Sequence, residues 1–76
     1  MKLHLGGQFS FYLSGNPRNV ELQLDEPVQL SQILVRLGIP VAEIHLVSVN
    51  GELVDLQKAW VSQQDEVKLY PPVSGG

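Results

Sequence analysis

The stretch that decides the fold is Leu30-Ser31-Gln32-Ile33-Leu34-Val35-Arg36-Leu37-Gly38. Four of its apolar residues follow the spacing i, i+3, i+4 and i+7, which places them on one face of an α-helix: Leu30, Ile33, Leu34 and Leu37. Gly38 stands where a helix C-cap adopts a left-handed conformation, and Pro40 prevents the helix from continuing. A helix of about two turns is stable only when it packs on a larger surface, so the rest of the chain is expected to supply a sheet.

Two alternating runs precede this helix. The first contains Leu3 and Leu5, then Phe9, Phe11 and Leu13, and its period of two predicts a half-buried strand. Gly6-Gly7 interrupts this run and indicates a bulge or a close approach of two backbones. The turn sequence Ser14-Gly15-Asn16-Pro17 leads to a second run, over residues 20–24, so the two runs predict a β-hairpin.

Further strand signals follow the helix. Residues 44–49 predict a third strand, Asn50-Gly51 is a strong hairpin turn signal, and residues 52–54 predict a short returning strand. Residues 56–64 are expected to form a loop with a helical turn. A last strand is predicted at 66–70 with Val67 and Leu69 inward, and Pro71-Pro72 ends it because proline cannot donate to a sheet ladder.

This order predicts an α+β protein with a β-grasp (ubiquitin-like) architecture, in which a mixed sheet of four to five strands packs on one short helix. The expected division is a β-grasp domain over residues 1–70 and a flexible C-terminal tail over residues 71–76, which ends in Gly75-Gly76. A chain of 76 residues has room for one domain, and 43% hydrophobic content is enough for a packed core.

Composition excludes several functions. The chain has no cysteine, so a disulfide framework, a thiolate zinc site and a cysteine nucleophile are excluded. The net charge is −3 and the five basic residues are scattered along the sequence, which argues against nucleic-acid binding. No stretch approaches the ~20 apolar residues of a membrane span, and the N-terminus lacks the apolar run of a signal peptide. We therefore expect a cytoplasmic protein without a membrane or nucleic-acid partner.

No pattern of side chains predicts an enzyme active site. His4 and His45 are far apart in the sequence and lack partners at metal-ligand spacing, so no metal site is expected. Neighbouring carboxylates at 25–26 and 65–66 alternate between the faces of a strand and are expected to be solvated. Ser74 has no base placed beside it by any motif and is better explained as a small spacer.

Three segments resemble one known family. Val49-Asn50-Gly51, Asp65-Glu66-Val67 and the ending Pro71-Pro72-Val73-Ser74-Gly75-Gly76 are similar to the MoaD/ThiS family of ubiquitin-like sulfur carriers. The terminal Gly-Gly after Pro-Pro-Val is the specific element, and the ending is most similar to small subunits of molybdopterin synthase. The sequence departs from the family at Gln63-Gln64, where a glycine is usual, and in its long first-strand region.

The resemblance implies a role for the C-terminus. The Gly76 carboxylate would be adenylated by a ubiquitin-activating-type adenylyltransferase, similar to MoeB or ThiF, which uses ATP and magnesium, so the chain itself would bind no cofactor. The resulting thiocarboxylate would donate sulfur to a MoaE-like large subunit, which is the acceptor implied by the ending, or to a ThiG-like enzyme. The chain would act as a carrier and not as a catalyst.

The residue types of the tail suit that role. Gly75 and Gly76 have no side chains, so they can enter a narrow channel in a partner. Val73 is expected to be a small apolar anchor and Ser74 a spacer, while Pro71 and Pro72 stiffen the exit from the domain. Terminal glycines are also tolerated without function, because chain ends are often frayed.

On the outward face of the sheet, Leu46, Lys68 and Tyr70 are expected to form a partner surface beside the tail. Tyr70 also fits simple packing at the sheet edge, and Trp60 fits either a cover over the core or a surface anchor. Three other functions remain open: a ThiS-like carrier for thiamin thiazole synthesis, a ubiquitin-like protein modifier, and a non-covalent interaction module.

Overall fold

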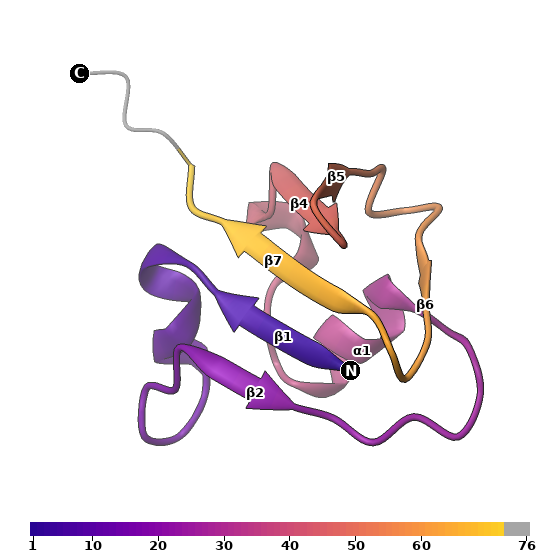
Figure 1. The fold of residues 1–76 in the computed structure, drawn as a ribbon. Helices are drawn as coiled ribbons and strands as arrows, with labels where there is room; N and C mark the ends of the chain where they lie inside the picture. Colours follow the sequence, from indigo (N-terminus) through magenta and orange to yellow (C-terminus); the bar gives the residue numbers. More distant parts are fainter. Residues whose placement is uncertain (73–76) are drawn as a thin grey trace.

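The fold was analysed in a computed structural model, which describes residues 1–72. A five-stranded mixed sheet forms its centre, in the order β2-β1-β7-β4-β5 (Figure 1). The strands are β1 (Lys2–Leu5), β2 (Asn19–Glu21), β4 (Leu46–Val49), β5 (Glu52–Leu53) and β7 (Glu66–Tyr70). β1 and β7 are parallel, and every other pair is antiparallel. The predicted α+β, β-grasp architecture with a mixed sheet is confirmed.

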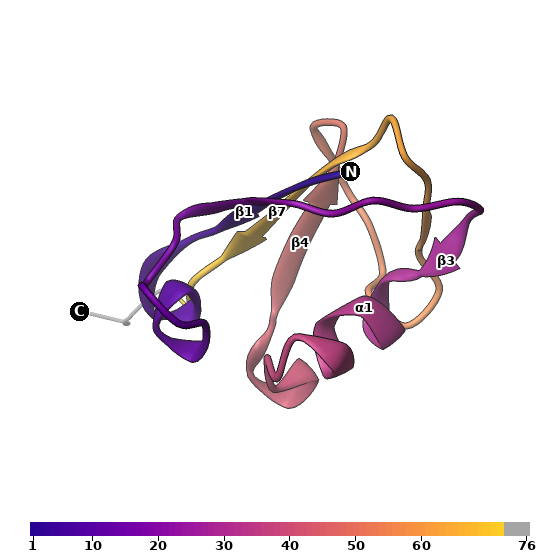
Figure 2. The same ribbon diagram turned by 90° about the horizontal axis from the view of Figure 1, so that it is seen from below.

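Helix α1 (Leu30–Arg36) covers one face of this sheet, as Figure 2 shows. Leu30, Ile33 and Leu34 are buried, so the predicted apolar face meets the core. The helix ends in a Schellman motif: the Gly38 N–H donates to the Val35 carbonyl at 3.1 Å and the Ile39 N–H donates to the Leu34 carbonyl at 2.9 Å. Gly38 has a φ of +79°, as the sequence predicted.

The core lies between α1 and the inner face of the sheet. Its buried residues include Leu3 and Leu5 from β1 and Val67 and Leu69 from β7, which are the two central strands. Both inward positions predicted for β7 are therefore confirmed. Within residues 1–72, no helix combines the length and the apolar character needed to cross a bilayer.

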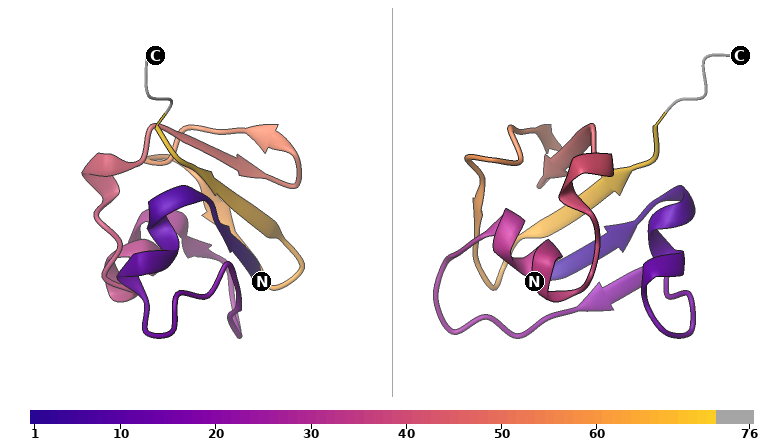
Figure 3. Two further views of the ribbon diagram at one scale, coloured as in Figure 1. Left: turned by 90° about the vertical axis from the view of Figure 1, so that its left-hand side faces the viewer. Right: turned by 180° about the vertical axis from the view of Figure 1, so that it is seen from behind.

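The prediction of a strand over Phe9, Phe11 and Leu13 is wrong. Residues Gly7–Tyr12 form a 3-10 helix, η1, which lies beside the end of β1 (Figure 3). Phe9 is fully buried whereas Phe11 is 68% exposed, so the two rings do not share the face that a strand would give them. Gly7, with a φ of +55°, turns the chain out of the sheet, and this turn decides the outcome.

A second 3-10 helix, η2 (Val41–Glu43), follows α1. The hydroxyl of Tyr12 in η1 donates a hydrogen bond to Oε2 of Glu43 in η2. This hydrogen bond raises the pKa of Tyr12, because ionisation of the phenol would place a second negative charge beside the carboxylate. The two short helices are thus tied together at the surface.

The predicted loop over residues 56–64 contains a strand. β6 (Trp60–Val61) pairs antiparallel with β3 (Val28–Gln29), the strand immediately before α1, and the two strands form a separate sheet. Val61 is 1% exposed and belongs to the core, while Trp60 is 60% exposed and lies on the surface. Pairs of two residues are too short to show the alternation from which strands are predicted. The second and third predicted strands are also shorter than expected.

Candidate functional site

The candidate site is the point where the chain leaves the body after β7. β7 pairs with β1 on one side and with β4 on the other, and Val67 and Leu69 are fully buried. The strand ends at Tyr70, and Pro71 and Pro72 after it are exposed. The end of β7 is therefore held by neighbours on both sides and by the core, so Pro71 has a defined place on the body.

Four residues of the predicted site lie outside the described residues. They are the proposed adenylation site Gly76 and its neighbours Val73, Ser74 and Gly75. Their roles, and the flexible tail predicted over residues 71–76, stay predictions. The structure places the two proline positions and the predicted partner surface, and it shows how these are built.

The predicted close approach at Gly6-Gly7 occurs at this same point. The Gly6 N–H donates to the Leu69 carbonyl oxygen at 3.0 Å, which extends the β1–β7 pairing by one residue. The next residue, Gly7, lies against the ring of Pro71. The link from β1 to η1 therefore touches the first residue of the C-terminal segment.

The outward face of the sheet carries an apolar patch next to Pro71, formed by Leu46, Leu53 and Tyr70, and called here the outer-face patch. Leu46 lies directly across from Tyr70 in the β4–β7 pair, and their exposed fractions are 47% and 37%. Leu53 on β5 is 67% exposed and lies across from Ser48 on the same face. Leu46 and Tyr70 were predicted from the sequence for this patch, whereas Leu53 was not, although the Asn50-Gly51 turn fixes its register.

Ser48 lies on the outward face of β4 but is only 1% exposed. Its hydroxyl is 3.1 Å from the hydroxyl of Tyr70, and the two form a hydrogen bond. The Tyr70 side chain thus reaches across the patch and covers Ser48. This hydrogen bond restricts the ring, so the patch has a definite shape before any partner arrives.

Lys68 lies beside the patch in a polar row. It is the cross-strand neighbour of Ser48 on β4 and of His4 on β1. The next residue in this row is Asn19 on β2, whose Oδ1 is 2.9 Å from Nδ1 of His4. One half of the outward face is therefore apolar and the other half is polar, with the exposed Lys68 near the boundary.

The start of β7 is fixed by Asp65. Its carboxylate accepts hydrogen bonds from Nδ2 of Asn50 at 2.9 Å and from the Ser62 N–H at 2.8 Å. The Asn50 side chain also accepts from the Glu66 N–H at 2.9 Å, which joins the β4–β5 turn to β7. The bond from Asn50, followed by that from Ser62, lowers the pKa of Asp65. Asp65, which follows the unusual Gln63-Gln64, thus has a structural role.

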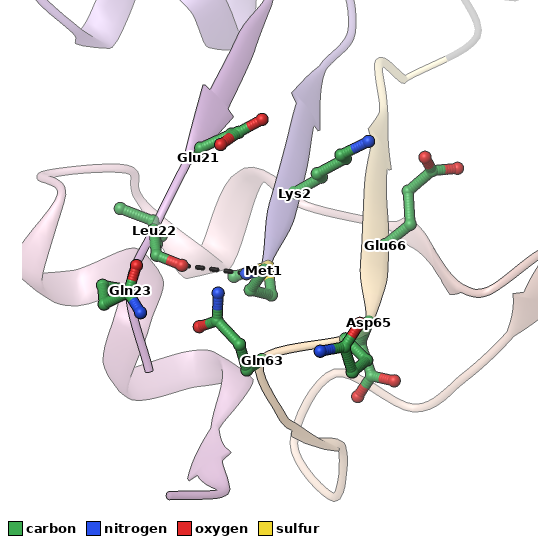
Figure 4. A pocket seen from close by; sticks show the side chains of 9 residues that line it. Met1, Lys2, Glu21, Leu22, Gln23, Gln63, Asp65 and Glu66 are labelled. Atoms are coloured by element: carbon green, nitrogen blue, oxygen red, sulfur yellow. Dashed lines mark hydrogen bonds between the residues drawn. The ribbon is translucent and has the colours of Figure 1, made fainter. Parts of the chain in front are cut away.

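A hollow lies at the start of β7, at the opposite end of this strand from Pro71 (Figure 4). The ammonium group of Met1 donates to the Leu22 carbonyl at 2.8 Å beside it, and Oε1 of Gln63 accepts from the Leu24 N–H at 2.6 Å. These polar groups are already bonded to the backbone. Across residues 1–72, no three His, Asp or Glu side chains come together as a possible metal site. The hollow is not part of the candidate site.

Fold and site together define a ubiquitin-like domain whose last strand lies at the centre of the sheet and ends at the exposed Pro71-Pro72. The sequence profile described as the ThiS family matches residues 11–76, and the chain belongs to this family. Members of the family are small sulfur carriers, which implies an adenylyltransferase and a sulfur-accepting enzyme as general partners. The match begins inside η1, so β1 and Gly6-Gly7 lie outside it.

One similar solved structure is the NMR solution structure of a thiamine biosynthesis protein from Geobacter metallireducens. It shares 23% sequence identity with this chain at a TM-score of 0.54, and the alignment covers 100% of this chain and 88% of the other. At this identity the likeness supports the fold alone. A comparison with curated proteins found no match.

Proposed function

We propose that this protein is a sulfur carrier whose C-terminal Gly76 carboxylate is adenylated and then converted to a thiocarboxylate. The observation that carries this proposal is the end of β7: a strand paired on both sides stops at Tyr70 and leads into the exposed Pro71-Pro72. Membership of the ThiS family supports the same role. The chain then acts as a co-substrate in the cytoplasm, and a partner provides the catalysis.

The chemistry needs that partner for two reasons. A carboxylate is a poor electrophile, because its negative charge repels nucleophiles, so an adenylyltransferase similar to MoeB or ThiF must first join it to AMP at the expense of ATP, with magnesium. The chain has no cysteine, so the sulfur must come from a persulfide on another protein. The persulfide displaces AMP, and a thiol then cleaves the sulfur–sulfur bond to leave the thiocarboxylate.

The outer-face patch with Lys68 is the surface that we propose for docking this adenylyltransferase. Leu46, Leu53 and Tyr70 are large and exposed on the outward face of the sheet, and Tyr70 immediately precedes Pro71. Apolar groups that are fixed before binding lose little side-chain entropy on association. The hydrogen bond between Tyr70 and Ser48 provides such fixation.

The acceptor that we propose is a MoaE-like large subunit, which places the chain in molybdopterin biosynthesis. The support for it is the ending Pro71-Pro72-Val73-Ser74, which is similar to that of molybdopterin-synthase small subunits. A second candidate acceptor is a ThiG-like enzyme of thiazole synthesis, and the match to the ThiS family profile is the support for it. Incubating the thiocarboxylate form with each acceptor and following loss of sulfur by mass spectrometry distinguishes the two.

The activation step is tested with the full chain, an active MoeB/ThiF-type adenylyltransferase, magnesium, ATP and a persulfide donor. We expect a mass increase equal to exchange of one oxygen for one sulfur, and we expect none in a variant that lacks Gly75-Gly76. An unchanged mass, when the same enzyme activates its own carrier, overturns the proposal. Isopeptide-linked conjugates that disappear in the truncated variant would instead indicate a protein modifier.

A further inference from the structure

Gly6 and Gly7 differ from the other glycines in what surrounds them. An ideal Cβ on Gly6 would lie 2.5 Å from the Leu69 carbonyl oxygen and 3.0 Å from Cδ of Pro71. An ideal Cβ on Gly7 would lie 2.5 Å from Cβ of Pro71 and 3.0 Å from its Cγ. Two consecutive glycines thus leave room for one proline ring, at the residue that follows β7.

A methyl group added at residue 6 or 7 could not be accommodated by moving a flexible side chain. The atoms that would collide belong to the backbone of a central strand and to a ring whose φ is fixed by covalent closure, and neither is the free end of a flexible side chain. At the other described glycines with positive φ, namely Gly15, Gly38 and Gly51, an added Cβ would meet nothing within 4 Å. Backbone conformation alone therefore favours glycine at these three turns, whereas close packing limits residues 6 and 7 to glycine.

We propose that Gly6 and Gly7 form a seat for the Pro71 ring that sets the direction in which the C-terminal segment leaves the body. They are then positioning residues for the activation of Gly76, and this inference rests on the proposed function. The seat holds the ring from the β1 side, and the Gly6 N–H bond to the Leu69 carbonyl holds the strand just before it. The first residue outside the sheet is thus part of the folded body.

The direction of the chain at Pro71 affects where the reacting carboxylate of Gly76 can lie. Gly76 lies five positions after Pro71, so an extended chain spans at most about 17 Å between them. A rotation of about 20° at Pro71 displaces the end of such a chain by about 6 Å. The intervening residues can recover this displacement only by bending, which costs entropy when the segment binds in a narrow channel.

The seat is tested by Gly7→Ala with Gly15→Ala as the matched control. Both residues lie in the β1–β2 connection and both have positive φ, of +55° and +82°, so both variants strain the backbone. Only the methyl group at residue 7 meets Pro71. A second variant, Pro71→Gly, removes the ring and leaves the seat empty without introducing a clash, so it tests the same contact should Gly7→Ala fail to fold.

Two measurements apply to each variant. In weakly aligned solution, amide residual dipolar couplings of residues 73–76 report the mean direction and the averaging of the segment without any partner. Steady-state kinetics with the adenylyltransferase and Mg-ATP report KM and kcat. For Gly7→Ala and Pro71→Gly we expect changed couplings and a KM about tenfold higher with little change in kcat. For Gly15→Ala we expect wild-type couplings and wild-type KM.

The outcomes separate the seat from the proposed function. Couplings and KM in Pro71→Gly that match the wild type overturn the seat, as does a KM in folded Gly7→Ala that equals that of Gly15→Ala. If the wild-type chain is not adenylated at all, the proposed function fails, and the couplings alone still decide whether the glycines direct the segment. In the double variant Gly7→Ala/Pro71→Gly, the added methyl should cost no more stability than it costs in Gly15→Ala.

Discussion

Replacement of Leu34 by alanine tests the packing of the body most directly. Leu34 is 0% exposed, and its backbone carbonyl also accepts the Ile39 N–H at the end of α1. Truncation of a buried leucine costs about 2–5 kcal/mol, from lost burial together with the cavity that remains. At about 0.05–0.15 kcal/mol per residue, the 76 residues have a total stability of about 4–11 kcal/mol. One truncation is therefore expected to remove a large share of the free energy of unfolding.

The appropriate assay is urea unfolding followed by far-ultraviolet circular dichroism. The fluorescence of Trp60 is a weaker probe, because this side chain is already 60% exposed in the folded state. Val35→Ala is the matched control, since Val35 is the next residue of the same helix and is 67% exposed. We expect the control to change the free energy of unfolding by less than about 0.5 kcal/mol. Equal values for the two variants would refute the assignment of the buried helix face.

Three further predictions concern charge, docking and the terminus. The hydrogen bonds of Asp65 lower its pKa, so its contribution to the free energy of unfolding is complete above the unfolded-state pKa of about 4 and is lost as pH falls through the lower folded-state value. In Asn50→Ala, the free energy of unfolding measured with urea should therefore decrease less steeply on acidification between about pH 7 and 2. Leu46→Glu should raise KM for adenylation at least about tenfold. Its unfolding midpoint should stay nearly unchanged, because Leu46 is 47% exposed in the folded state. An unaltered KM would exclude the outer-face patch as the docking surface. Gly76→Ala should impair activation without a measurable change in unfolding, and a large loss of stability would show that the terminus takes part in the fold.

Sequence rules were sufficient where structure depends on a few neighbouring residues. Asn50 and Gly51 have φ values of +52° and +86°, as a two-residue hairpin turn requires, and this turn places Leu53 opposite Ser48. Gly38 ends the helix by the same kind of local preference for positive φ. These features need no knowledge of distant parts of the chain, so the order of the main elements was predictable.

The wrong predictions concern segments whose local conformation depends on contacts with residues far away in the sequence. Phe9 and Phe11 have the spacing of a strand, but Phe9 packs into the core from η1 while Phe11 faces solvent. β6 forms because Trp60-Val61 pairs with residues before α1, a contact between segments about thirty residues apart. The contact between Gly7 and Pro71 has the same character. The sequence indicated either a bulge or a close backbone approach at Gly6-Gly7, and only the structure shows that the first residue after β7 packs there.

Side chains of β7 point alternately to the core and to the outward face, so different residues of this strand contribute to stability and to recognition. Val67 and Leu69 are fully buried, so substitutions there act through the core, whereas Lys68 and Tyr70 face outward beside the departing chain. The hydroxyl of Tyr70 bonds to Ser48 on β4, so removing only this hydroxyl, as in Tyr70→Phe, keeps the apolar ring and frees its orientation. A partner that recognises a preformed patch should then bind more weakly through the entropy of ordering the ring, although no apolar contact has been lost. This effect would distinguish recognition by a fixed surface from recognition by hydrophobic area alone.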